Sequence, residues 1–355
     1  MKPEKVFIYA PGFYGIDKAI AEAFELAGVQ CVLGNSRQMS IGEKTARELG
    51  NRISLIKPLT NKLLKRHLDL ENKEFLRIVE KEKPDLLFII KGDSLLPETL
   101  QKLKNKITLA AYIWDDPFFS YSKQYNLGDD YRKSNFELGM FLYDYVFVYD
   151  TYYVDTLKKR GLLNVKYLPL AADPKRYREI VTTPEDTVKY GYDLCFVGCP
   201  YPNRVEILDS LKQYNLGVFG EGWEKYFLQK GKKLPSYYKG KASGDKVLSI
   251  YLSSKIVLNI HDPEAREGLN TRTFDILACG ASELVDYRKN LDVHFKMGKE
   301  MIAFKDKTEL LSAVSYYLKN MGLLSKVAIE GRQRVLTEHT WDHRVRTVLD
   351  VLNEH

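Results

Sequence analysis

Short apolar segments alternate with segments of helical periodicity along the first half of the chain. Residues 5–10 (KVFIYA) form an apolar run that ends at the turn PGFYG, and residues 16–28 repeat apolar positions at helical spacing as far as Gly28. Further apolar runs lie at 29–34, 84–93, 107–116 and 143–150. Strands that are apolar on both faces and separated by helices predict a parallel sheet covered on both sides.

The same alternation begins again in the second half of the chain. Residues 192–198 predict a strand, 205–217 a helix, and 216–223 the next strand and loop, and later strands are expected at 255–261 and 282–287 around a helix at 273–280. The intervening segment carries Pro169, Pro174 and Pro184, which is typical of a connector. We therefore expect an α/β protein with two Rossmann-like, doubly wound domains that face each other across a cleft.

The predicted domain limits follow from these patterns. Residues 1–170 form an N-terminal Rossmann-like domain, residues 171–188 a linker and residues 189–337 a C-terminal Rossmann-like domain. Residues 338–355 predict an amphipathic terminal helix that packs back toward the first domain. A chain of 355 residues is also too long for one ordinary hydrophobic core, which favours two domains.

Composition and charge narrow the class of partner. Apolar residues make up 45% and charged residues 28% of the chain, which is typical of soluble globular proteins. The net charge of +7 suits an anionic small ligand, an acidic acceptor or a membrane surface, and we expect no nucleic acid partner. Neither a signal peptide nor a transmembrane segment is predicted, so a cytoplasmic protein is expected. Peripheral membrane contact stays open because residues 62–67 are basic and amphipathic, although a solvated helix face is the simpler account.

No metal and no other cofactor is expected from the sequence. The four cysteines lie in or beside apolar runs, and the histidines are scattered, which favours buried thiols over a zinc site. The acid pair after the 107–113 run also lacks the Asp-x-Asp spacing of metal-dependent transferases. The cysteines are Cys31, Cys195, Cys199 and Cys279.

Glycines and polar residues follow the predicted strands of the first domain, where a parallel sheet binds its ligands. The turn at residues 12–15 brings backbone close to a phosphate or sugar, or is an ordinary turn between strand and helix. The acids after Trp114 are candidates for a general base that acts on an acceptor hydroxyl, or for a cap at the strand end. The residues along this rim are Gly12, Phe13, Tyr14, Gly15, Lys91, Gly92, Asp93, Trp114, Asp115 and Asp116.

The segment 267-EGLNTRTFDILACG-280 carries the most specific pattern. A helix is expected to begin near Thr271, capped by Asn270 or Thr271, and its N–H groups and dipole favour a diphosphate. Arg272 adds a guanidinium for the phosphates, and a carboxylate at Asp275 can accept both hydroxyls of a ribose. Glu267 lies in the preceding loop, toward a sugar hydroxyl. The alternative is that both acids merely favour the positive end of the helix.

Glu267-x7-Asp275 followed by Ala-Cys-Gly resembles the signature of retaining GT-B glycosyltransferases, with Asp for the second Glu and with Gly268-Leu269 two residues earlier than in that signature. More closely, the run from Asn270 to Asp306 resembles the C-terminal domain of CgeB-type (spore maturation, YkvP-like) glycosyltransferases. The segments FVGCPYPNRVEIL, KGD, WDDP and YLPLAADPKRY are similar to that family in the same order. The resemblance covers most of the chain.

The resemblance implies a GT-B enzyme that binds a nucleotide-diphosphate sugar, with UDP as the expected nucleotide, mainly in its C-terminal domain. The acceptor, a saccharide, glycan or protein, would bind mainly to the N-terminal domain. Transfer would be retaining and independent of metal. Arg204 and Arg272 would face the diphosphate, Asp275 the ribose and Glu267 a sugar hydroxyl. The base would lie at Tyr238, Lys239 and Gly240.

Two other functions stay open at this point. One is a nucleotide-sugar epimerase or hydrolase on the same scaffold, since a fold alone does not fix a reaction. The other is a non-catalytic nucleotide- or sugar-binding protein of spore or envelope assembly. His261 and Asp262, at the end of the run KIVLNI, are weaker candidates because a single histidine at a strand end is more often structural.

Overall fold

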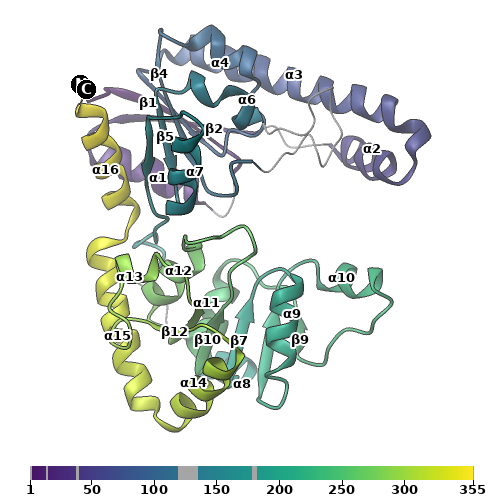
Figure 1. Cartoon of the computed structure of the whole chain (residues 1–355), viewed down its shortest axis with the longest axis vertical. Helices are drawn as coiled ribbons and strands as arrows, with labels where there is room; N and C mark the ends of the chain where they lie inside the picture. Colours follow the sequence, from purple (N-terminus) through teal and green to yellow (C-terminus); the bar gives the residue numbers. More distant parts are fainter. Residues whose placement is uncertain (1, 13–14, 37–39, 119–134, 178–181, 355) are drawn as a thin grey trace. The chain divides into compact units, whose positions relative to one another are not determined.

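The chain forms two compact units, which Figure 1 shows in colours that follow the sequence. The computed structural model describes residues 2–12, 15–36, 40–118, 135–177 and 182–354. Unit 1 comprises Met1–Pro169 and Arg344–His355, and unit 2 comprises Leu170–His343. The last helix, α16 (Trp341–Asn353), therefore begins in unit 2 and continues into unit 1.

Unit 1 is built on a parallel six-stranded sheet with the strand order β2-β1-β3-β4-β5-β6. Its central strand β3 is buried along its whole length and β4 at all but its first residue, as the continuous apolar runs predict. The strands are β1 (Lys5–Ala10), β2 (Gln30–Asn35), β3 (Leu86–Ile90), β4 (Thr108–Ile113), β5 (Tyr145–Val148) and β6 (Val165–Tyr167).

The helices of unit 1 connect these strands. The connection between β2 and β3 is the longest, and it is a helical hairpin of α2 and the 26-residue helix α3. The described helices are α1 (Ile16–Leu26), α2 (Ile41–Arg52), η1 (Ser54–Ile56), α3 (Lys57–Glu82), α4 (Pro97–Leu103), α6 (Asn135–Gly139), η2 (Met140–Leu142) and α7 (Thr151–Lys159).

Unit 2 contains a second parallel six-stranded sheet, with the order β12-β11-β10-β7-β8-β9. This is the strand order of a classic dinucleotide-binding sheet, with the first strand of the unit at its centre. The strands are β7 (Leu194–Val197), β8 (Leu216–Phe219), β9 (Tyr238–Gly240), β10 (Ile256–Asn259), β11 (Glu283–Asp286) and β12 (Ile302–Phe304).

Helices pack on this second sheet around a core that includes Phe196, Trp223 and Leu258. The segment predicted as a linker contains one of them, α8, next to residues that lie outside the described part of the chain. The helices are α8 (Pro184–Tyr190), α9 (Pro202–Asp209), α10 (Trp223–Gln229), α11 (Asp245–Ser253), α12 (Thr271–Cys279), α13 (Leu291–His294), α14 (Lys307–Lys319) and α15 (Met321–Glu338).

The predicted α/β class with two doubly wound sheets is confirmed. No helix in the described ranges combines the length and the apolarity that a bilayer crossing needs.

Candidate functional site

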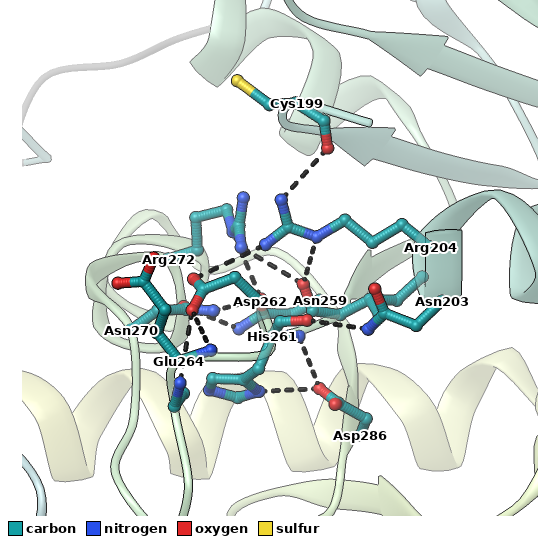
Figure 2. A network of polar contacts seen from close by, with 12 residues as sticks. Cys199, Asn203, Arg204, Asn259, His261, Asp262, Glu264, Asn270, Arg272 and Asp286 are labelled. Carbon is teal, nitrogen blue, oxygen red and sulfur yellow. Dashed lines mark hydrogen bonds and ion pairs between the residues drawn. The ribbon is translucent and has the colours of Figure 1, made fainter. Parts of the chain in front are cut away.

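The polar residues of unit 2 gather where the direction of its sheet topology reverses. β7 has β8 on one side and β10 on the other, so the loops that follow β7 and β10 lead away from each other at the carboxyl ends of the strands. Ligands of open α/β sheets bind at such a point. Figure 2 shows the side chains that meet there, from the start of α9, the end of β10, the start of α12 and the end of β11.

Asn259, the last residue of β10, is the centre of this network. Its side chain is fully buried at the end of an otherwise apolar strand, where an unpaired amide would be costly. The Nδ2 atom donates to Thr273 Oγ1 at 3.0 Å and to Glu283 Oε1 at 2.7 Å. Its Oδ1 atom accepts from Asn270 Nδ2 at 3.0 Å and from Arg272 Nε at 3.2 Å. Asn259 therefore ties the start of α12 to the sheet.

The helix α12 begins and ends as its sequence suggests. Asn270 is the N-cap, and its side chain accepts from the Thr273 N–H at 3.1 Å. Gly280 ends the helix with φ of 86°, a left-handed conformation that favours glycine. The N–H groups of Thr271 and Arg272 have no acceptor within the helix, because the first turn of a helix cannot supply one. The positive end of α12 thus lies beside Asn259.

Arg272 spans the two strands at the switch point. Its half-buried guanidinium donates to Val197 O at 3.3 Å and Ile260 O at 3.2 Å, besides its bond to Asn259. Among the described residues no carboxylate lies within ion-pair distance of it. The guanidinium is thus held by neutral oxygens, which leave its positive charge without a direct ion-pair partner among the described residues.

Arg204, near the start of α9, supplies a second cation. Only 2% of the residue is exposed, and its guanidinium donates to Ile260 O at 2.9 Å and to Cys199 O at 3.0 Å. Asp262 Oδ2 lies 3.8 Å from Nη2. Burial lowers the pKa of Arg204 to about 10, and the nearby charge of Arg272 acts in the same direction. Arg204 joins the loops that follow β7 and β10 and adds positive charge to the switch point from a buried position.

The two guanidinium groups lie over the same ring. The Cζ atoms of Arg204 and Arg272 are 5.6 and 5.7 Å from the centroid of the Phe196 ring, within the range of a cation–π contact. Glu283 does not neutralise them, because burial raises its pKa well above the ordinary value and favours the uncharged acid. The switch point therefore carries a local excess of positive charge.

His261 and Asp286 form a buried pair next to this network. His261 Nδ1 is 2.6 Å from Asp286 Oδ1, which also accepts from the His261 N–H at 2.8 Å, and Arg288 Nη2 lies 3.0 Å from Asp286 Oδ2. Burial acts to raise the pKa of Asp286, but its interactions with His261 and Arg288 outweigh burial and lower it. The carboxylate is therefore ionised, and it fixes the orientation of the imidazole.

Three buried polar atoms of the network lack a hydrogen-bond partner in the described part of the chain. They are Asn203 Oδ1, His261 Nε2 and Glu283 Oε2. Buried polar groups are usually satisfied, so such a concentration in one place is unusual for a purely structural network.

Asp275 lies in the second turn of α12 and contacts the segment that enters unit 2. Tyr177 Oη donates to its Oδ1. Burial raises the pKa of Asp275 to about 6, although the Tyr177 hydrogen bond and the charge of Arg176 act in the opposite direction. The ribose-binding role of Asp275 stays a prediction, and any ligand hydroxyl would share this carboxylate with Tyr177.

Glu267 is fixed in the loop before α12. Its carboxylate lies 3.3 Å from Lys289 Nζ, and its backbone oxygen accepts from the Asn290 N–H at 3.0 Å. The role toward a sugar hydroxyl stays a prediction.

The residues predicted to hold the base form β9, at the edge of the sheet. The Tyr238 ring stacks on Trp223 with centroids 5.7 Å apart, and its hydroxyl donates to Glu224 Oε1 at 2.7 Å. Lys239 is exposed and bonds to Ser236 O at 2.9 Å. Gly240 has a φ of 107°. Their role at a base is likewise still a prediction.

The candidates of unit 1 lie at the carboxyl ends of β1, β3 and β4. Lys91 and Asp115 form an ion pair, and Lys91 has a φ of 67°, which is rare for a residue with a side chain. Asp116 Oδ1 accepts from the Phe118 N–H at 2.9 Å, and the Trp114 ring meets Tyr112 edge to face.

The turn after β1 is only partly described. Gly12 and Gly15 have φ values of 72° and 74°, and Gly15 is the N-cap of α1. Phe13 and Tyr14 lie outside the described residues, as does the aromatic-rich stretch 119–134.

Sequence reasoning missed several residues of the network. Asn259 was visible only as one amide in the apolar run KIVLNIH, and Asp286 as the second acid in SELVDY. Glu283 and Tyr177 were not singled out, because their partners are distant in the sequence. In the described ranges no His, Cys, Asp or Glu cluster is suited to hold a metal ion.

Parts of the sequence are similar to known proteins. Residues 204–350 match a family model described as glycosyl transferase-like. The spore protein CgeB of Bacillus subtilis (strain 168) is 26% identical over 235 residues, which cover 61% of this chain and 68% of that protein. The matched family region includes Arg204, Asn259 and Arg272, whereas Cys199 and Asn203 of the network lie just before it.

Solved structures share the fold of the chain. Sucrose-phosphate synthase from Thermosynechococcus elongatus is similar with a TM-score of 0.67 and 11% identity over 99% of this chain and 98% of that one. Anabaena Alr3699/HepE in complex with UDP-glucose is similar with a TM-score of 0.66 and 11% identity, over 99% of this chain and 100% of that one.

Proposed function

We propose that this chain, a CgeB-like glycosyltransferase of the GT-B fold, transfers a sugar from a nucleotide diphosphate, with UDP as the expected nucleotide. The acceptor is a saccharide, glycan or protein. The observation that carries the proposal is the pair of guanidinium groups at the switch point of unit 2, Arg204 and Arg272, whose charge nearby carboxylates compensate only in part. A UDP-sugar is named as the ligand of one protein with a similar fold.

A diphosphate matches this charge. Two phosphates carry negative charge and many acceptor oxygens, and a guanidinium presents a planar fork of donors to them. The half-buried Arg272 is in position to contact such an oxygen, and the N–H groups that open α12 provide further donors beside it. The buried Arg204 contributes through its charge.

The same arrangement favours the reaction. When the glycosidic bond to the donor breaks, the negative charge on the departing diphosphate increases. Cations and helix N-terminal dipoles that are already oriented stabilise this charge more in the transition state than in the bound donor. They supply what a divalent cation supplies elsewhere, so we propose a transfer that is independent of metal.

The remaining roles extend the proposal to the sugar and the acceptor. Asp275 accepts hydrogen bonds from the ribose hydroxyls and shares its carboxylate with Tyr177. Glu267 lies toward a hydroxyl of the transferred sugar. The transfer retains the anomeric configuration of that sugar. In unit 1, Asp115 and Asp116 act on the acceptor hydroxyl, and Lys91 orients Asp115 through their ion pair.

Calorimetric titration with UDP, ADP and GDP tests the binding step. We expect UDP to bind, and Arg272→Ala to weaken binding by about tenfold to a hundredfold, because a charge-assisted hydrogen bond contributes about 1.5–3 kcal/mol. Lys255→Ala is the matched control, since Lys255 precedes β10 at the amino ends of the strands, away from the switch point, and forms an ion pair with Asp193 at 2.7 Å.

Turnover is then measured as release of UDP from UDP-glucose and related donors, with and without EDTA. Slow hydrolysis of one donor that persists in EDTA agrees with the proposal. If no nucleoside diphosphate binds, or if Arg272→Ala and Lys255→Ala bind UDP equally well, the assignment of the donor site is wrong. If EDTA abolishes turnover, the metal-independent mechanism is wrong.

A further inference from the structure

The helical hairpin of α2, η1 and α3 combines a partly polar interior, which also holds Leu64 and Phe75, with an outer surface of exposed aliphatic side chains. Its interior contains Glu43, Thr60, His67 and Glu71, all buried. Its outer surface carries large aliphatic side chains, although such residues are normally the first to be buried. The exposed aliphatic residues are Ile41, Leu49, Ile53, Leu55, Leu59, Leu63 and Leu70.

Polar contacts in the interior join the two helices of the hairpin to each other and to the sheet. His67 Nδ1 lies 3.1 Å from Glu43 Oε1 across the two helices, and His67 Nε2 lies 3.7 Å from Glu71 Oε2. Tyr9 in β1 donates its hydroxyl to Glu71 and thereby connects α3 to the sheet. Leu55 and Leu59 lie outside these contacts, with 89% and 72% of their surface exposed.

Four of the seven exposed aliphatic residues lie at one end of the hairpin. Ile53 ends α2, Leu55 lies in η1 with 89% of its surface exposed, and Leu59 in the first turn of α3 is 72% exposed. Leu63 follows Leu59 by four residues and so lies on the same side of α3. In Figure 1 this end of α3, with α2 beside it, is the end farthest from the strands of unit 1. It forms an apolar tip.

Basic side chains surround the tip. Lys62 and Arg66 each lie three residues after an exposed leucine, and Lys44 and Lys65 are exposed as well. Among the side chains described between residues 41 and 70, Asp69 is the single exposed acid. An apolar tip within a basic rim is complementary to an anionic lipid surface, where acyl chains receive the leucines and phosphates receive the cations.

We propose that the α2–η1–α3 hairpin docks on an anionic lipid bilayer, with Leu55 and Leu59 inserted at the level of the head groups. A second copy of the chain is a poorer occupant, because a symmetric contact would bring two identical basic rims together. This surface belongs to unit 1 and the donor site to unit 2. A failure of the lipid-docking proposal can therefore be distinguished from a failure of the proposed function.

Co-sedimentation with lipid vesicles tests the proposal on the full chain. Vesicles of equal parts phosphatidylglycerol and phosphatidylcholine are compared with pure phosphatidylcholine, at low and high salt. We expect binding to the anionic vesicles that weakens with salt, and Leu55→Ser/Leu59→Ser to lower the partition coefficient by about tenfold or more. Lys62→Ser/Arg66→Ser lowers it by about tenfold.

The matched control is Leu163→Ser/Leu228→Ser, which removes two equally exposed leucines, each 80% exposed, elsewhere on the chain. This control is expected to bind vesicles and UDP like the unaltered protein. The proposal fails if the unaltered protein ignores anionic vesicles, or if the Leu55/Leu59 variant binds them equally well. It also fails if sedimentation equilibrium shows a dimer that this variant dissociates while neither protein binds lipid.

Discussion

Gly198→Ala moves the Arg272 guanidinium without removing it. A Cβ at Gly198 would lie 2.6 Å from Arg272 Nη1 and 2.9 Å from Phe196 Cζ. Since non-bonded atoms prefer separations of about 3.5–4.0 Å, the guanidinium must retreat by about 1 Å. The Arg272 neighbour is the far end of a flexible side chain, whereas the buried Phe196 ring must shift by a few tenths of an ångström, so we expect the fold to survive at reduced stability.

The size of the effect follows from the bonds of Arg272. Its contacts to Val197 O, Ile260 O and Asn259 are already 3.2–3.3 Å long, so a shift of this size breaks or weakens them. Because the group is half-buried and water replaces part of what is lost, we expect the free energy of unfolding to fall by about 2–3 kcal/mol. UDP affinity should fall by about tenfold or more, since the donors no longer face the diphosphate.

Urea denaturation measures the first quantity and calorimetric titration the second. Gly322→Ala is the control, because an added Cβ there meets nothing within 4 Å and the residue lies in the exposed first turn of α15. Alanine should stabilise that helix by about 0.5–1 kcal/mol and leave UDP binding unchanged. If Gly198→Ala binds UDP within twofold of the unaltered protein, the position of Arg272 does not matter to the donor, and the reasoning from the switch point is refuted.

Three further predictions concern neighbouring residues. Ribose binding needs an ionised Asp275, whose pKa is raised to about 6, so UDP affinity should rise as the pH increases through 6. The Asp275→Asn variant should lack this rise in affinity. An identical pH profile in the variant would contradict the ribose-binding role. Glu283 has a raised pKa in the fold, so its contribution to stability is complete below about pH 4 and is lost as the pH rises. The free energy of unfolding of Glu283→Gln, measured in urea, should lack this decline. If the free energies of the variant and the unaltered protein change with pH in parallel, a neutral Glu283 is contradicted. Gly220→Ala should lower the free energy of unfolding by about 3 kcal/mol or more, because the φ of Gly220 is 140° and an added Cβ would lie 2.2 Å from the Gly198 carbonyl oxygen. An unchanged melting temperature would show that the ends of β7 and β8 can separate freely.

The central strands could be predicted because burial on both faces leaves a continuous apolar run. Lys5–Ala10 was predicted as a strand and is β1 with the same limits. The strands that were not predicted are β6, β9 and β12, which have three residues each and lie at sheet edges. Three residues are too few to leave a clear pattern, whereas the six-residue edge strand β2 was predicted.

The residues of the proposed donor site likewise divide into those that the sequence indicated and those that it did not. Asn270 and Arg272 could be singled out because they stand together at a helix start that local sequence determines. Asn259, Asp286 and Tyr177 could not, because their roles arise from tertiary contacts. The Tyr177–Asp275 hydrogen bond joins residues 98 positions apart, and no local pattern encodes it.

The path of the chain through the two units has a consequence for biosynthesis. Val345, Val348, Leu349 and Leu352 of α16 are buried, and Arg344 Nε donates to Pro169 O at 2.9 Å, so unit 1 includes residues that the ribosome adds after all of unit 2. The first unit to emerge is thus the last to be completed, and until then its missing helix leaves apolar surface exposed to chaperones and proteases.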